Sequence, residues 1–102
     1  MEPLSRITAA TVDVLIAVLN HSESTWGLSI IKESSRPAGS VYPILERLET
    51  SGWVTSRWED NSDRPGPRRR YYELSTDGAA AAREVVKNFT ARTTIAPRPV
   101  TP

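Results

Sequence analysis

The sequence of 102 residues has no cysteine and only one histidine, His21. Without cysteine the chain can form neither disulfides nor thiolate metal sites, and it has no thiol nucleophile. A single histidine leaves a transition-metal site or a histidine-based catalytic triad without the partners that it requires. We therefore expect no metal and no cofactor, and we interpret His21 as a residue at a helix end.

Long apolar segments are also missing from the sequence. No run approaches the about 18 consecutive apolar residues that are needed to span a membrane. Residues 1–11 lack the basic start and the unbroken apolar run of a secretion signal. We expect a cytoplasmic protein that does not bind membranes.

Closely spaced carboxylates outside the predicted helices are limited to Asp60 and Asp63. Both fall in a segment of turn-forming residues, where catalytic groups would be poorly positioned. Since no set of titratable groups converges elsewhere, we predict that the chain is not an enzyme.

The formal net charge is only +1, but the two halves of the chain differ. Residues 1–50 hold four basic and six acidic side chains, whereas residues 51–102 hold nine basic and six acidic ones. Arg64 and the run from Arg68 to Arg70 crowd one short segment of the second half. Because a polyanion responds to such local crowding more than to the total charge, this segment favours a nucleic-acid partner.

Three segments of the first half have apolar residues at helical spacing. Helices are predicted over residues 8–20, over residues 26–34, and between a proline-containing break at residues 34–38 and Gly52. Additional apolar residues on the first helix indicate either a central place in the domain or contact with a second subunit.

The second half begins with two strand-like segments, residues 53–59 and 70–74, which are rich in aromatic and β-branched residues. Residues 60–67 between them contain nearly every turn-forming residue type, which predicts a hairpin with a long, solvent-exposed tip. A final helix, capped by Ser75 or Thr76, is expected to end near Arg92.

This order of elements is typical of a winged helix-turn-helix, in which a β-hairpin forms the wing. The predicted fold class is α+β and mostly helical, with three helices, a two-stranded wing and one C-terminal helix. We assign residues 1–92 to one DNA-binding domain and expect residues 93–102, with three prolines, to form a disordered tail. The third helix would enter the major groove of double-stranded DNA, and the wing would reach an adjacent backbone.

Candidate DNA-binding side chains are those on the outer face of the third helix and on the basic strand of the wing. They are Arg36, Gly39, Ser40, Tyr42, Pro43, Arg47, Arg64, Arg68, Arg69 and Arg70. Simpler roles stay open for several of them. The arginine run could be a solvated strand edge, Ser40 could cap a helix, and Tyr42 could pack on the domain.

Two segments resemble the PadR family of transcriptional regulators. GSVYPILERLETSGWV, residues 39–54, is similar to the family's recognition helix, and RRRYYELSTDG, residues 68–78, is similar to its basic wing strand. The pair Trp26 and Gly27 matches the aromatic-glycine pair that opens the family's second helix. The resemblance implies a homodimeric repressor that binds a roughly palindromic operator and is released by a ligand or signal.

Many family members carry a long helical dimerisation domain, whereas only one helix and the tail follow the wing here. The resemblance therefore implies a dimer through the first and last helices. Two other hypotheses stay open. Trp53 and Trp58 could line a pocket for an unknown small-molecule effector instead of packing in the domain. The near-neutral charge also suits a winged-helix module that binds protein and not DNA.

Overall fold

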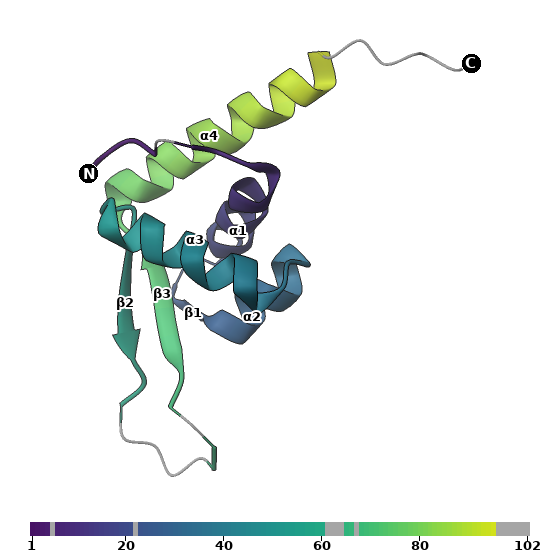
Figure 1. Cartoon of the computed structure of the whole chain (residues 1–102). Helices are drawn as coiled ribbons and strands as arrows, with labels where there is room; N and C mark the ends of the chain where they lie inside the picture. Colours follow the sequence, from purple (N-terminus) through teal and green to yellow (C-terminus); the bar gives the residue numbers. More distant parts are fainter. Residues whose placement is uncertain (5, 22, 61–64, 67, 96–102) are drawn as a thin grey trace.

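The computed structural model describes residues 1–4, 6–21, 23–60, 65–66 and 68–95, with residues 91–95 described by their backbone alone. The predicted succession of four helices and one hairpin is confirmed (Figure 1). In chain order the elements are α1 (Ala9–Leu19), β1 (Thr25–Trp26), α2 (Gly27–Ser34), α3 (Ala38–Thr50), β2 (Val54–Trp58), β3 (Arg70–Leu74) and α4 (Thr76–Ile95).

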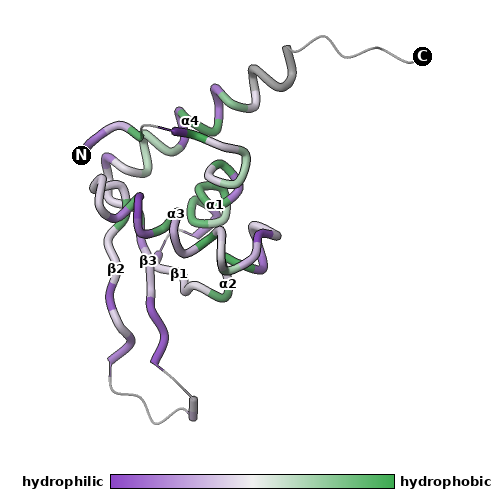
Figure 2. The backbone as a smooth tube through the Cα atoms, viewed as in Figure 1, coloured by the Kyte–Doolittle hydropathy of each residue, from purple (hydrophilic) through white to green (hydrophobic). Residues whose placement is uncertain are grey.

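Helix α1 forms the centre of the core and contacts α2, α3 and α4. Val14 and Leu15 are fully buried, and the apolar character of α1 stands out in Figure 2. The Thr8 side chain caps the helix by accepting a hydrogen bond of 3.2 Å from the Thr11 N–H. Of the two roles that the sequence left open for α1, the central place is therefore realised, although Ile16 stays 38% exposed.

The connection from α2 to α3 is a tight turn at the predicted break. Ser35 takes a left-handed conformation with φ of 58°, and Pro37 precedes the first helical residue of α3. The buried hydroxyl of Ser34 donates to the Ile31 carbonyl and accepts from the Arg36 N–H, each at 3.3 Å. These bonds stabilise the turn, which fixes how α3 projects from the domain.

A third strand, β1, was not predicted. Thr25 and Trp26 pair antiparallel with β3, so the sheet order is β1-β3-β2. Trp26 is thus a strand residue and the N-cap of α2, whereas the sequence placed it inside the second helix. Two residues are too few to show a strand period, and their pairing with β3 depends on residues far away in the sequence.

Helix α4 continues to Ile95, three residues beyond its predicted end at Arg92. Its backbone thus overlaps the start of the predicted tail at residue 93. Once a helix is nucleated, each added residue gains one hydrogen bond, so polar residues such as Thr93 and Thr94 can extend it. Residues 96–102 lie outside the described residues.

Helix α4 starts against the turn between α3 and β2. Ser75 caps it as predicted, since its hydroxyl accepts a hydrogen bond of 2.9 Å from the Gly78 N–H. Gly78 is buried so closely against Trp53 that a Cβ atom would collide with the Trp53 carbonyl oxygen. This position needs glycine for the close approach of two backbones.

Gly78→Ala is therefore expected to lower the free energy of unfolding by about 1–3 kcal/mol, because either α4 or the turn at Trp53 must shift. Chemical denaturation would measure it. Gly39→Ala is the matched control, since nothing lies within 4 Å of the added Cβ atom and alanine favours the helix. Equal stability of the two variants would show that α4 does not depend on this contact.

Candidate nucleic-acid interface

Helix α3 divides cleanly into a buried and an exposed face. Its buried side chains are Val41, Ile44, Leu45 and Leu48, which recur at helical spacing. Gly39, Tyr42, Pro43 and Arg47 are exposed, and Ser40 is half-buried beside them. No side chain of the described residues caps the first turn of α3. The helix therefore presents polar side chains and backbone donors on one outer surface, which is what readout of a DNA groove requires.

Arg36 lies just before α3 and forms an ion pair with Asp13 on α1. Its Nε and one terminal nitrogen both lie 2.9 Å from Oδ2 of Asp13. The pair is partly exposed, so it contributes little to stability. It does neutralise one of the positive charges that the sequence assigned to the DNA-binding surface.

Arg47, Gly39, Ser40 and Pro43 line one wall of a shallow groove of about 270 Å³. The other wall consists of residues that precede α1 or lie in its first turn: Arg6, Thr8, Ala10 and Thr11. We call this hollow the arm groove. Arg6 was not among the sequence candidates, because nothing in the sequence places residue 6 beside a helix that begins at residue 38.

The wing arginines stack on aromatic rings. The guanidinium of Arg69 lies 3.9 Å from the centre of the Trp26 ring, and that of Arg70 lies 4.9 Å from the Trp58 ring. Arg57 on β2 makes the same contact with Tyr71 at 4.9 Å. Such cation–π contacts orient the arginines along the hairpin.

Hydrogen bonds further restrain this strand. Arg68 donates twice to the Glu59 carbonyl oxygen, at 2.9 and 2.6 Å. Arg70 donates to the Ser56 hydroxyl at 2.6 Å and lies 3.8 Å from the Glu49 carboxylate. Arg68, Arg69 and Arg70 are thus each restrained by contacts on the wing, whereas Arg64 lies outside the described residues.

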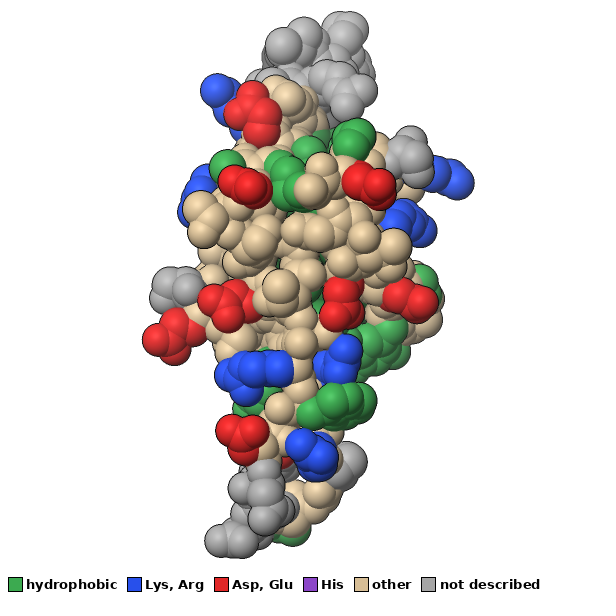
Figure 3. All heavy atoms as spheres, turned by 90° about the vertical axis from the view of Figure 1, so that its left-hand side faces the viewer, with side chains coloured by type: hydrophobic (Ala, Val, Ile, Leu, Met, Phe, Trp, Pro, Cys, Tyr) green, Lys and Arg blue, Asp and Glu red, His purple; other side chains and the backbone are tan. Residues whose placement is uncertain are grey.

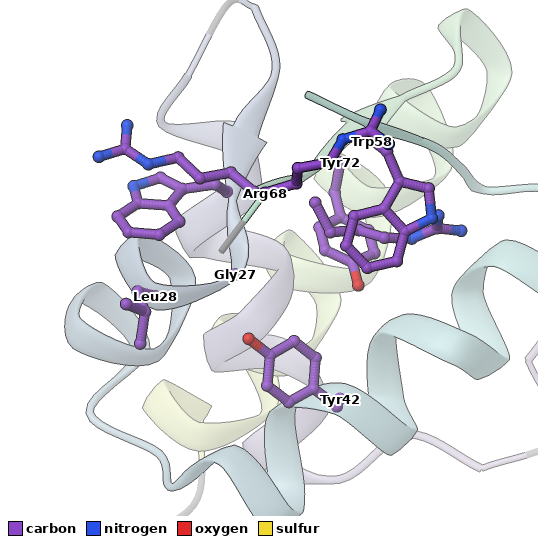
Figure 4. A pocket seen from close by; sticks show the side chains of 9 residues that line it. Gly27, Leu28, Tyr42, Trp58, Arg68 and Tyr72 are labelled. Atoms are coloured by element: carbon purple, nitrogen blue, oxygen red, sulfur yellow. The ribbon is translucent and has the colours of Figure 1, made fainter. Parts of the chain in front are cut away.

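Between α2, α3 and the hairpin lies a cavity of about 390 Å³, shown in Figure 4, which we call the wing cavity. Three exposed hydrophobic side chains, Leu28, Tyr42 and Trp58, border it. Its remaining lining consists of Trp26, Gly27, Arg68, Arg69, Arg70 and Tyr72. Aromatic walls with a few polar groups are the usual composition of a small-molecule site.

Tyr42 closes one side of the wing cavity. Its ring lies so near Gly27 that any side chain there would collide with the hydroxyl. Burial raises the pKa of Tyr72, although the charge of Arg70 and its hydrogen bond act in the opposite direction. The Tyr72 hydroxyl therefore stays protonated at neutral pH.

The two tryptophans of the predicted strand, Trp53 and Trp58, have different places, since β2 begins only at Val54. Trp53 is in the core, with 3% of its surface exposed, and its indole N–H donates to the Glu2 carbonyl at 2.6 Å. Trp58 is 54% exposed and borders the wing cavity. Only Trp58 therefore could contact a ligand.

Arg69 contributes the one side-chain nitrogen, Nε, that is buried without a hydrogen-bond partner among the described residues.

Figure 3 shows acidic side chains across the middle of one face, with basic and hydrophobic side chains below them toward the end of the hairpin. Within the described part of the chain, no cluster of histidine and acidic residues could hold a metal ion. No described helix is long and apolar enough to cross a membrane.

The helices, the exposed face of α3 and the basic hairpin together define a winged helix-turn-helix protein of the DNA-binding class. The sequence profile of the transcriptional regulator PadR-like family matches residues 15–84. The chain belongs to this family. It is accordingly a DNA-binding transcription regulator and not an enzyme.

Several solved structures share the fold of this chain. BpsR of Bordetella bronchiseptica is 25% identical with a TM-score of 0.69, and the match covers 95% of this chain and 72% of BpsR. A PadR family regulator of Clostridium difficile R20291 is 22% identical, with a TM-score of 0.65 and coverages of 82% and 92%. Smu.1704 of Streptococcus mutans is 21% identical, with a TM-score of 0.66 and coverages of 90% and 88%. A comparison with curated proteins found no significant match.

Proposed function

We propose that the protein is a repressor that binds a roughly palindromic operator as a homodimer. The observation that carries this proposal is the exposed face of α3, where Tyr42, Pro43 and Arg47 lie on the same helix as a fully internal apolar face. A major groove about 12 Å wide admits such a helix. Gly39 and Ser40 would approach the bases with little side-chain bulk in the way.

The wing would bind the adjacent backbone through Arg68, Arg69 and Arg70. Their stacking and hydrogen bonds hold them in place before DNA arrives, so binding costs less side-chain entropy. Arg36 would contribute less than these three, because its guanidinium is already paired with Asp13. Arg64 belongs to the same proposed surface by its sequence position alone.

DNA binding is expected to weaken steeply as salt increases, in fluorescence titrations with duplexes selected from a random pool. Changing Arg68, Arg69 and Arg70 together to alanine should lower the slope of log K against log salt by about 0.9 for each phosphate that is no longer neutralised. The decrease in affinity should be alike for all sequences. Ser40→Ala or Tyr42→Phe should in addition change the preferred sequence.

Changing Arg68, Arg69 and Arg70 together to lysine separates the effect of charge from that of stacking. The variant keeps the positive charges but loses the flat guanidinium groups that stack on aromatic rings. It should retain most of the salt slope. Arg83→Ala, an exposed residue of α4, is the control and should bind as the unchanged protein does. Binding that does not respond to salt would contradict the proposed interface.

The homodimer would form through α1 and α4. Ile16 on α1 is 38% exposed, and Val85 and Val86 on α4 are only half-buried by their own chain. Figure 1 shows α4 projecting past the other elements, where a second α4 could pack along it. A two-fold dimer would bring two α3 helices to half-sites about 34 Å apart.

Sedimentation should therefore give a mass near twice the 11.3 kDa of one chain. Ile16→Glu is expected to raise the dimer dissociation constant at least about tenfold, since a charge in an apolar interface costs more than about 1.4 kcal/mol. Leu28→Glu, at a position that is 49% exposed and borders the wing cavity, is the matched control and should stay dimeric. A monomer at high concentration would argue against a palindromic operator.

We further infer that the wing cavity binds the effector, and that a planar aromatic carboxylate suits it. DNA binding by BpsR is regulated by 6-hydroxynicotinic acid. In this chain, the ring of such an acid would lie against Trp58 and Tyr42, and its carboxylate would meet the arginines that line the cavity, Arg68, Arg69 and Arg70. The same arginines are proposed to bind DNA, so an occupied cavity would compete with the operator.

Saturating 6-hydroxynicotinic acid should quench tryptophan fluorescence and raise the Kd for DNA at least about tenfold, or about 1.4 kcal/mol. The matched control is 2-hydroxypyridine, which lacks the carboxylate and should have little effect. Trp58→Ala should weaken both the quenching response and its effect on DNA binding, although Trp26 stays in the lining. Normal DNA binding without any response to the acid would reject the effector site and leave the operator proposal intact.

A further inference from the structure

Residues 1–4 and 6–8, which we call the N-terminal arm, are anchored at the far end of α3. The Glu2 N–H donates to the Ser51 carbonyl at 2.8 Å, and the Glu2 carbonyl accepts from the Trp53 indole at 2.6 Å. Met1 packs over Gly52, where a Cβ atom would lie 3.4 Å from the Met1 Cα. These contacts hold the start of the arm on the turn that follows α3.

The other end of the arm lies beside the first turns of α3. Leu4 packs against the core, and Arg6 and Thr8 line the arm groove opposite Gly39 and Ser40. The arm therefore runs alongside α3 in the opposite direction, from the last residue of the helix to its start. Its course can be followed in Figure 1 as the purple segment between N and α1.

Arg6 differs from Arg36 and Arg70 in its surroundings. It is exposed, and within the part of the chain that the structure describes it has no ion-pair partner. Arg47, across the arm groove, also lacks one among those residues. These two guanidinium groups thus flank the groove beside α3 with no carboxylate of the described chain on them. Neither is needed to fill the core, since both are exposed.

We propose that the N-terminal arm is a second DNA-contacting element, in which Arg6 binds a backbone phosphate next to the bases that α3 reads. The hydrogen bonds of Glu2 with Ser51 and Trp53 hold the arm in position. This proposal rests on the proposed entry of α3 into the major groove. When α3 lies in the groove, the backbone that borders it passes the arm groove, where Arg6 and Arg47 supply the charge that a phosphate requires.

An arm that only stabilises the fold would account for the packing of Leu4 against the core and for the hydrogen bonds of Glu2. It would not account for an exposed arginine beside α3. The two roles differ in what Arg6 does. A structural arm needs no charge at residue 6, whereas a phosphate contact needs a cation there and makes binding more sensitive to salt.

Arg6→Ala is expected to weaken DNA binding about threefold to tenfold for all sequences and to lower the salt slope by about 1. Arg6→Lys should keep the slope, and Arg83→Ala should leave affinity and slope unchanged. Fluorescence titration of the full chain over a salt series gives both quantities. Wild-type affinity and slope in Arg6→Ala would overturn the proposal.

The anchor is tested with Glu2→Pro, which removes the N–H that donates to Ser51. Glu2→Gln is matched to it in charge and keeps this N–H. Glu2→Pro should bind DNA more weakly than Glu2→Gln. Arg6→Ala should lower the DNA affinity less in the Glu2→Pro variant than in the unchanged protein. Equal binding by the two Glu2 variants would reject the positioning role.

Hydrogen exchange of the Glu2 amide separates this proposal from the proposed function. Protection of that amide in free protein supports an ordered arm, and rapid exchange overturns it, whatever the DNA measurements give. If the amide is protected but the unchanged protein binds no duplex in a salt-sensitive way, the proposed interface of α3 fails and the phosphate role of Arg6 fails with it.

Discussion

The hydrogen bonds of Trp53 hold α3, α4 and the N-terminal arm at the start of β2. Its backbone N–H donates to the Leu48 carbonyl at the end of α3, and its carbonyl accepts from the Ser75 N–H before α4. Its indole N–H donates to Glu2 in the N-terminal arm. Gly78 permits this arrangement, since any larger residue would push α4 away from the Trp53 carbonyl. The angle between α3 and the hairpin is thus set at the point where α3, β2, α4 and the arm meet.

Contacts between residues close in the sequence were predictable from the sequence. Helical spacing identified α1, α3 and α4, because a buried face repeats its apolar residues whatever it packs against. The cap at Ser75 and the hairpin between β2 and β3 also follow from local residue types. The outer face of α3 could be predicted for the same reason, because the residues that are not apolar on an amphipathic helix are those left exposed.

Features that join distant segments could not be predicted in this way. The strand β1 exists because Thr25 pairs with Tyr72, and Arg36 is neutralised because Asp13 lies on the facing helix. The place of Arg6 beside α3 depends on an anchor at Ser51. Each requires the fold to be known first, since pattern and propensity act over a few residues only. The site was therefore predicted as two separate elements without the arm, and a pocket was predicted only through Trp53 and Trp58, of which Trp58 borders the wing cavity.

The near-neutral charge of the chain is compatible with a polyanionic partner because its charges are arranged in pairs and in isolated groups. Asp13 and Glu49 lie beside Arg36 and Arg70 respectively. A phosphate responds to charges within about 8–10 Å at physiological salt, so distant acidic groups barely reduce its attraction to the wing. Weak long-range attraction keeps binding to arbitrary DNA low. Affinity must then come from short-range contacts on a surface of fixed shape, which favours a regulator that selects one sequence over a protein that coats DNA.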